Sequence, residues 1–248
     1  MTWAWAQDQD DRDISLSEIL STAAIEWGSY ILLLAGSIRS LKIHHEAPPI
    51  ESEIKDLHMA GAARQIPIIL VPSLHSGASI FRSLKWRLKA KFYSSIWPFS
   101  FRPFLYRSSL LEDDLQQFIT TCLKKTRSKY FRLISFGSSR PIVSRVLNSS
   151  RTGGHCLQWV CISGAALPSK TQRLLSTPRF RSVYHTAPYT ERPPDLLIAG
   201  THDVICYPET IWGDTKAKLS VTPVGHYAVL MHSKTLHAIL DQFGDAEL

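Results

Sequence analysis

The stretch that decides the fold is Tyr130-Phe-Arg-Leu-Ile-Ser-Phe136, followed at once by Gly137-Ser-Ser139-Arg-Pro141. Its first half is a short apolar run of the kind that forms a buried parallel strand, and residues 142–147 then show helical spacing of apolar side chains. The sequence therefore predicts a strand, a tight turn that carries serines, and a helix. Such a turn can push one hydroxyl clear of the sheet and leave the next amide free at a helix N-terminus to hold an oxyanion.

The same alternation of apolar runs and amphipathic stretches extends on both sides of this unit. We expect strands at 66–72, 92–97, 130–136, 156–163, 196–199 and 219–224. Helices are expected at 80–91, from the capping box Ser109-Leu-Leu-Glu112 onward, at 142–147, and from about 232 to 243. Strands that alternate with helices predict an open, mostly parallel α/β sheet flanked by helices, with right-handed crossovers.

The length of 248 residues suits one compact domain. Residues 66–248 form its predicted core, interrupted at 164–194 by a proline-rich, irregular segment that we interpret as a short cap insertion. Residues 1–65 form a predicted extension packed on the core. The extension contains a predicted helix from Leu16, whose apolar face includes Trp27 and Ile31. Residues 37–65 show no clear helical or strand spacing of apolar side chains.

Charge and cysteine usage narrow the class of protein. The net charge is +7, and residues 82–151 hold fifteen Lys or Arg against three acids, which predicts a basic surface that an anionic membrane face could contact. No nucleic-acid module is recognisable, so no nucleic-acid partner is expected. The four cysteines lack a paired C-x-x-C, and neither a signal peptide nor a membrane span is seen. We therefore expect a reduced, cytoplasmic protein, with peripheral membrane association as an open alternative.

Chemistry-bearing residues follow three successive predicted strands. Ser139 follows the strand at 130–136, Asp203 comes just after the strand at 196–199, and His226 follows the strand at 219–224. At the carboxyl edge of a parallel sheet, a histidine can take the proton of a serine while an aspartate fixes its tautomer. Each residue also has a structural interpretation, as a helix N-cap, a loop cap and a buried histidine respectively.

Over about residues 66–243 the chain resembles the α/β-hydrolase family, and in particular its lipase- and esterase-like members. The resemblance rests on Ile69-Leu-Val-Pro-Ser-Leu-His-Ser-Gly77, Gly137-Ser-Ser139, Ala199-Gly-Thr-His-Asp203-Val-Ile-Cys-Tyr-Pro208 and Val224-Gly-His226, which occur in the family's order. It implies that Ser139 is the nucleophile, His226 the general base and Asp203 the orienting acid.

The resemblance also implies that the amides of Leu74 and Arg140 form the oxyanion hole. His75 and Leu167 are weaker candidates for the substrate pocket. No Walker or dinucleotide glycine motif and no H-E-x-x-H spacing is present, so neither a cofactor nor a metal is expected.

Two departures from the family pattern leave an alternative open. The pattern G-x-S-x-G ends here in Pro141, and the family's His-Gly at the first loop is replaced by Pro72-Ser73. In a second register, Ser135-Phe-Gly137-Ser-Ser139 is the elbow and Gly137 takes the nucleophile position, which would make the protein catalytically inactive. We favour Ser139, because Gly137 two positions ahead then matches the family's first glycine.

The expected function is hydrolysis of carboxylic esters, with a small apolar ester or lipid as substrate, through an acyl-enzyme on Ser139. The alternative is an inactive binding or scaffold protein of the same fold. The sequence leaves the oligomeric state undetermined.

Overall fold

The computed structural model describes residues 24, 27, 28, 31, 66–74, 76–91, 93–101, 108–149, 152–164, 192–203, 217–221 and 223–244. The cap insertion predicted at 164–194 lies outside the described residues except for its ends, and so does most of the extension at 1–65. On the apolar face predicted for the N-terminal helix, the side chains of Trp27 and Ile31 are both 59% exposed. The packing of the extension on the core stays a prediction.

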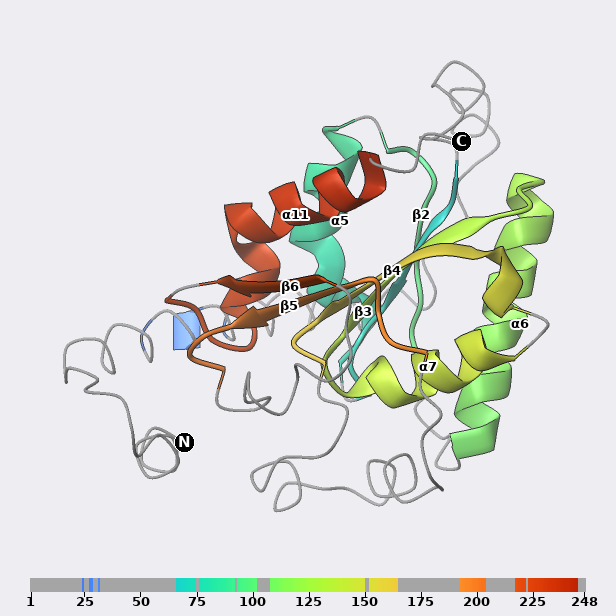
Figure 1. Ribbon diagram of the computed structural model, residues 1–248, viewed down its shortest axis with the longest axis horizontal. Coiled ribbons are helices and arrows are strands. Elements are labelled where there is room, and N and C mark those ends of the chain that lie inside the picture. Colours follow the sequence, from blue (N-terminus) through green and yellow to red (C-terminus); the bar gives the residue numbers. More distant parts are fainter. Residues whose placement is uncertain are drawn as a thin grey trace.

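Within the described residues, parallel strands form one open sheet in the order β2-β1-β3-β4-β5-β6 (Figure 1). The strands are β1 Ile68–Val71, β2 Ile96–Pro98, β3 Phe131–Phe136, β4 Cys156–Ile162, β5 Leu196–Gly200 and β6 Ala217–Val221. The predicted open parallel sheet is confirmed. The last strand differs from its prediction, because it ends at Val221 and the chain then turns: the carbonyl of Val224 accepts a hydrogen bond from the amide of His202 in the neighbouring loop.

Helices cover both faces of the sheet. α5 Arg82–Lys89 and α11 Ser233–Gly244 lie on one face, and α6 Ser108–Thr126 and α7 Arg140–Asn148 lie on the other (Figure 1). Short 3-10 turns precede three of these helices and β4: η1 Ala78–Phe81, η2 Gly137–Ser139, η3 Gly153–His155 and η4 Ala228–Met231. The described connections between strands therefore cross one face of the sheet or the other. As a result, both faces of the sheet are buried under helices.

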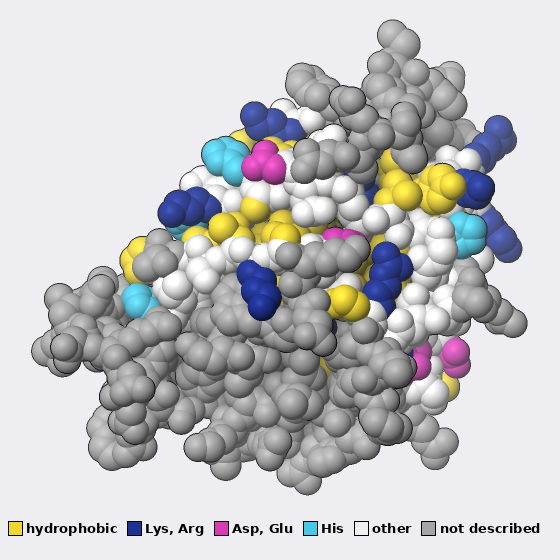
Figure 2. Space-filling model, viewed as in Figure 1, with side chains coloured by type: hydrophobic (Ala, Val, Ile, Leu, Met, Phe, Trp, Pro, Cys, Tyr) yellow, Lys and Arg dark blue, Asp and Glu magenta, His cyan; other side chains and the backbone are white. Residues whose placement is uncertain are grey.

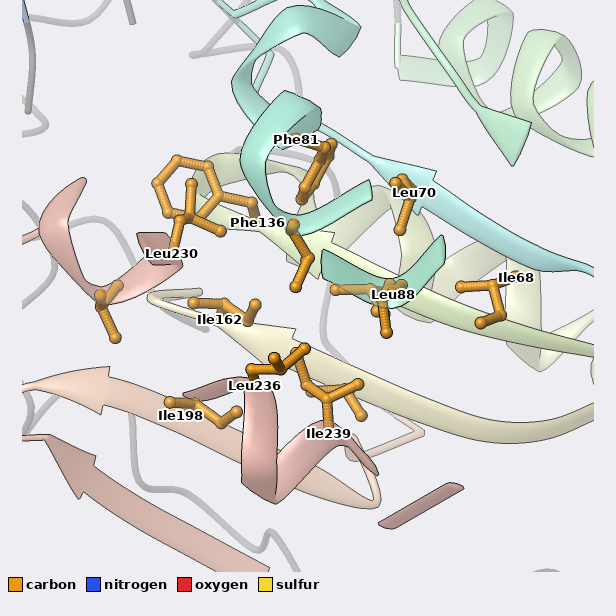
Figure 3. Close-up of a cluster of buried hydrophobic side chains, with 14 of the residues drawn as sticks. Ile68, Leu70, Phe81, Leu88, Phe136, Ile162, Ile198, Leu230, Leu236 and Ile239 are labelled. Atoms are coloured by element: carbon orange, nitrogen blue, oxygen red, sulfur yellow. The ribbon is translucent and has the colours of Figure 1, made fainter. Parts of the chain in front are cut away.

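Two hydrophobic clusters fill the space between the sheet and its helices. Successive strand residues point to opposite faces, so Ile68 and Leu70 contact the α5 and α11 layer, while Ile69 and Val71 contact the α6 and α7 layer. Figure 3 shows the cluster on the α5 and α11 face, in which Leu88 of α5 and Ile239 of α11 pack against the strands. Burial on both faces explains why the strands appear in the sequence as continuous apolar runs.

The start of α6 differs from its prediction. The helix begins at Ser108, so Ser109 lies within its first turn and does not act as the N-cap of a box. Glu112 instead accepts from the Nε of Arg145 on α7 at 2.6 Å. This ion pair ties the two helices of that layer together at their partly exposed edge, where such pairs contribute about 0 to 1 kcal/mol.

The described surface carries the basic character that the sequence predicts. On the face shown in Figure 2, Lys and Arg side chains are spread over the described surface and acidic side chains are sparse. None of the described helices combines the length and hydropathy that a membrane crossing requires.

Candidate active site

The turn after β3 is built around Gly137, which has a φ of +60°. L-amino acids rarely adopt this conformation, whereas glycine does so without steric cost. A Cβ placed on Gly137 would lie 3.4 Å from Nε2 of His226 and 3.2 Å from Cβ of Ser73. Gly137 is therefore the residue at the strained strand-to-helix turn that faces the histidine, which is the position of the nucleophile in a nucleophile elbow.

His226 and Asp203 meet at the same edge of the sheet. Nδ1 of His226 lies 2.9 Å from Oδ2 and 3.1 Å from Oδ1 of Asp203, and both residues are buried. Because Nδ1–H donates to the carboxylate, the neutral ring presents Nε2 as a hydrogen-bond acceptor toward Gly137. The two residues that the sequence predicts as base and orienting acid are thus brought together, and their catalytic roles stay predictions.

The loops that carry this dyad are held by close backbone approach and ring packing. A Cβ on Gly200 would meet the carbonyl oxygen of Val224 at 2.2 Å, so only glycine lets the end of β5 approach the loop that holds the histidine. The imidazole of His226 packs against the rings of Phe136 and Tyr227, with centroids 4.7 and 5.0 Å away, and these two rings also contact each other at 5.9 Å. These contacts orient the imidazole before any ligand binds.

Ser139 does not lie with the dyad, which corrects the nucleophile predicted from the sequence. Its side chain is fully buried, and its Oγ donates to the carbonyl of Phe136 at 3.0 Å, with the carbonyl of Val71 at 3.4 Å. In the 3-10 turn, the residue two positions after Gly137 points back under the end of β3 and not toward the histidine. The register with Gly137 at the nucleophile position is therefore the one the structure adopts.

The amides predicted for the oxyanion hole are both engaged. The amide of Leu74 donates to Oγ of Ser138 at 3.2 Å, and the amide of Arg140 donates to the carbonyl of Gly137 as the first turn closes. The Arg140 amide therefore lies outside the site, which corrects its predicted role in the oxyanion hole. The cause is the same as for Ser139, because the elbow residue is Gly137. With Gly137 at the elbow, the amide that follows the nucleophile position belongs to Ser138. Pro141 is buried in the first turn of α7, where its missing N–H costs nothing.

Sequence reasoning missed two hydroxyls, those of Ser73 and Ser138, whose Oγ atoms are 2.7 Å apart. Ser73 stands where the family has glycine, and its Oγ lies 3.3 Å from the Cβ position of Gly137. A serine side chain from the first loop thus fills the space next to the elbow that a nucleophile on residue 137 would need. The signals in the sequence were Ser73, which stands where the family pattern has glycine, and the second register, in which Gly137 takes the nucleophile position.

His75 and Leu167, the weaker pocket candidates, lie outside the described residues. In the part of the chain that the structure describes, no group of three or more His, Cys, Asp or Glu is placed to hold a metal ion.

Comparison with known proteins gives matches of fold and none of sequence. No protein-family model and no curated protein matches the chain. A hydrolase from Pseudomonas aeruginosa PA01 matches with a TM-score of 0.57 at 13% identity, over 75% of this chain and 92% of that one. The type II thioesterase BorB of the borrelidin biosynthetic cluster matches with a TM-score of 0.54 at 16% identity, over 72% and 92%.

A meta-cleavage product hydrolase from Pseudomonas fluorescens also matches, with a TM-score of 0.52 at 15% identity over 73% of this chain and 92% of that one. The chain therefore has the α/β-hydrolase fold, as its sequence resemblance implied. The residue at the elbow departs from the family pattern G-x-S-x-G. The turn carries Gly137 at the position where that pattern has serine.

Proposed function

We propose that this protein binds a carboxylic ester or another small apolar acyl compound at the Gly137 elbow without forming an acyl-enzyme. The observation that carries the proposal is the glycine that faces Nε2 of His226. Covalent acyl transfer needs a hydroxyl or thiol next to the base, and residue 137 supplies neither. The serine-hydrolase mechanism expected from the sequence would need Ser139, whose hydroxyl donates a hydrogen bond to the carbonyl of Phe136 at the end of β3.

The remaining groups suit recognition of an acyl compound. Nε2 of His226 can accept a hydrogen bond from a hydroxyl or a protonated acid, and the Ser73 and Ser138 hydroxyls, which share one hydrogen bond, keep one O–H that can donate to a carbonyl oxygen. The Asp203 carboxylate keeps the imidazole in the tautomer that this requires. The names of the matching structures, which include a thioesterase and hydrolases, support an acyl compound as the ligand class.

Restoring the nucleophile tests the proposal directly. We expect wild-type protein to remain unlabelled by a fluorophosphonate probe, and the Gly137→Ser variant to become labelled at residue 137, because the new Cβ would lie 3.4 Å from Nε2 of His226. Labelling should increase when Ser73→Gly is added, since this removes the side chain that crowds the new serine. It should disappear in Gly137→Ser/His226→Ala, where the base is lost.

Binding is measured separately, by calorimetry of wild-type protein with p-nitrophenyl butyrate and by release of nitrophenol. We expect saturable binding without release, and weaker binding in His226→Ala. Two results would overturn the proposal. One is labelling of wild-type protein at Ser73 or Ser139 together with ester hydrolysis that is lost when that serine is replaced by alanine. The other is the absence of any binding by well-folded wild-type protein.

A further inference from the structure

His232 lies at the junction between η4 and α11. It occupies the N-cap position of α11, because its backbone is extended, with φ of −72° and ψ of 142°, and its carbonyl accepts from the amide of Leu236. Nδ1 of its ring lies 3.2 Å from the amide nitrogen of Lys234 in the first turn of the helix. A backbone amide can only donate, so Nδ1 is the acceptor of this hydrogen bond. The bond therefore forms only while the imidazole is neutral.

The surroundings of this ring oppose its protonation. Among the described residues, the charges that act on it are both positive, those of Lys234 on α11 and Arg87 on α5, and η4 has no titratable side chain. Arg87 is held beside the junction, because its guanidinium donates to the carbonyl of Met231 at 2.8 Å. Burial, and then these two charges, lower the pKa of His232 below its ordinary value. A proton on the ring would also stand at the positive end of the α11 dipole, so protonation removes a hydrogen bond and adds repulsion.

The junction is continuous with the loop that carries His226, since the chain runs from His226 through η4 directly to His232. Oγ1 of Thr235, in the first turn of α11, donates to the carbonyl of Val229 at 2.6 Å. The amide of Val229 in turn donates to the carbonyl of Gly225 at 3.4 Å. The first turn of α11 thus holds η4, and η4 holds the residue next to His226.

We propose that His232 is a proton-sensitive N-cap, whose protonation loosens η4 and the loop that carries His226. The native junction favours the neutral ring, so an opened junction binds a proton more readily. The contribution of the cap is therefore complete above about pH 6.5 and declines as the pH falls below that value, toward the lower pKa of the native ring. The proposal does not depend on the function of the elbow site.

Hydrogen exchange of the full chain, followed by mass spectrometry, tests this inference. We expect peptides that cover residues 223–232 and 233–244 to lose protection by about threefold or more between about pH 7.5 and pH 5.5, after correction for intrinsic exchange rates. His232→Asn should keep its protection over this range, because asparagine caps helices well and does not titrate.

The matched control is His155→Asn. Nδ1 of His155 lies 2.9 Å from the carbonyl oxygen of Lys129, which can only accept, so this ring donates and a second proton leaves its bond intact. The control variant should therefore show the pH dependence of the wild type. Circular dichroism of each variant checks that it is folded.

A measurement on wild-type protein needs no substitution. In NMR spectra, the amide nitrogen of Lys234 should titrate with the same midpoint as the ring of His232. An amide that does not follow the ring would overturn the proposal, and so would a folded His232→Asn variant that loses protection in acid as the wild type does. Loss of protection confined to residues 233–244 would overturn the link to the His226 loop.

Discussion

Two residues at the elbow, Gly137 and Ser73, shape the space next to His226. Gly137 removes the hydroxyl that would face His226, and Ser73 places its own side chain against the same space. The dyad beside it stays hydrogen-bonded and buried. At this scale the structure brings the imidazole of His226 and the carboxylate of Asp203 together and places no side-chain hydroxyl on residue 137.

The close approach of residues 73 and 137 predicts an energetic coupling between them. Gly137→Ser should lower the free energy of unfolding by about 1 to 3 kcal/mol, because serine must adopt the positive φ and its Cβ would press on Ser73. Adding Ser73→Gly should recover about 0.5 to 1 kcal/mol of that loss by relieving the contact, while the backbone strain remains. Urea denaturation of the four proteins in the cycle measures the coupling.

The control for this cycle is Gly154→Ser. A Cβ on Gly154 meets nothing within 4 Å, so this variant should be nearly neutral. Strict additivity of the two substitutions at 73 and 137 would contradict the steric interpretation.

At the scale of single elements, the ends of α6 show how local rules and tertiary context compete. The predicted capping box lies within the helix, and its glutamate contacts α7 instead. The other end follows a local rule: the amide of Ser128 donates to the carbonyl of Leu123 and the amide of Arg127 to that of Lys124, the pattern of a Schellman motif. Arg127 takes the left-handed position, with a φ of +51°, where glycine is preferred.

This geometry predicts a difference in stability between two substitutions at the end of α6. Arg127→Gly should be about 1 kcal/mol more stable than Arg127→Ala, because both variants remove the exposed arginine side chain and only glycine lacks the Cβ that opposes a positive φ. Thermal and urea unfolding of the two variants provide the comparison. A glycine variant no more stable than the alanine variant would show that residue 127 bears no strain in solution.

At the scale of the whole molecule, the sheet and its two helical layers bury the reactive groups of the core as one unit. Cys122 of α6 and Cys156 and Cys161 of β4 belong to the same hydrophobic cluster. Burial raises the pKa of the Cys122 thiol and raises that of Cys156 to about 12. A thiol must ionise to react, so neither group has appreciable thiolate near neutral pH.

Alkylation of these cysteines should therefore report unfolding of the entire core. We expect Cys122, Cys156 and Cys161 to stay unmodified by iodoacetamide at pH 8 in native protein and to become reactive together over the urea transition. Mass spectrometry of the three cysteine peptides after a short alkylation pulse makes the measurement. Reaction of Cys122 at lower urea than the two β4 cysteines would mean that α6 detaches before the sheet unfolds.

Much of this architecture could be predicted, because strands buried on both faces must be continuously apolar and helices that cover them must be amphipathic. The strand at 130–136 and the helix after it were both found from that pattern, and Asp203 and His226 were placed at strand ends that proved to be neighbours. The boundaries of short elements were harder, as β6 shows, since a turn can begin within an apolar run.

The sequence by itself determined the order of strands and helices, the open parallel sheet and the edge at which polar residues gather, since these follow from hydrophobic periodicity along the chain. Only the tertiary structure decided which residue of Gly137-Ser-Ser139 faces His226. A shift of one or two residues at a turn redirects a side chain entirely, and both registers contained a glycine and a serine at plausible places. The outcome was settled by the end of β3 at Phe136 and the positive φ that follows it, which depend on contacts between segments far apart in the sequence.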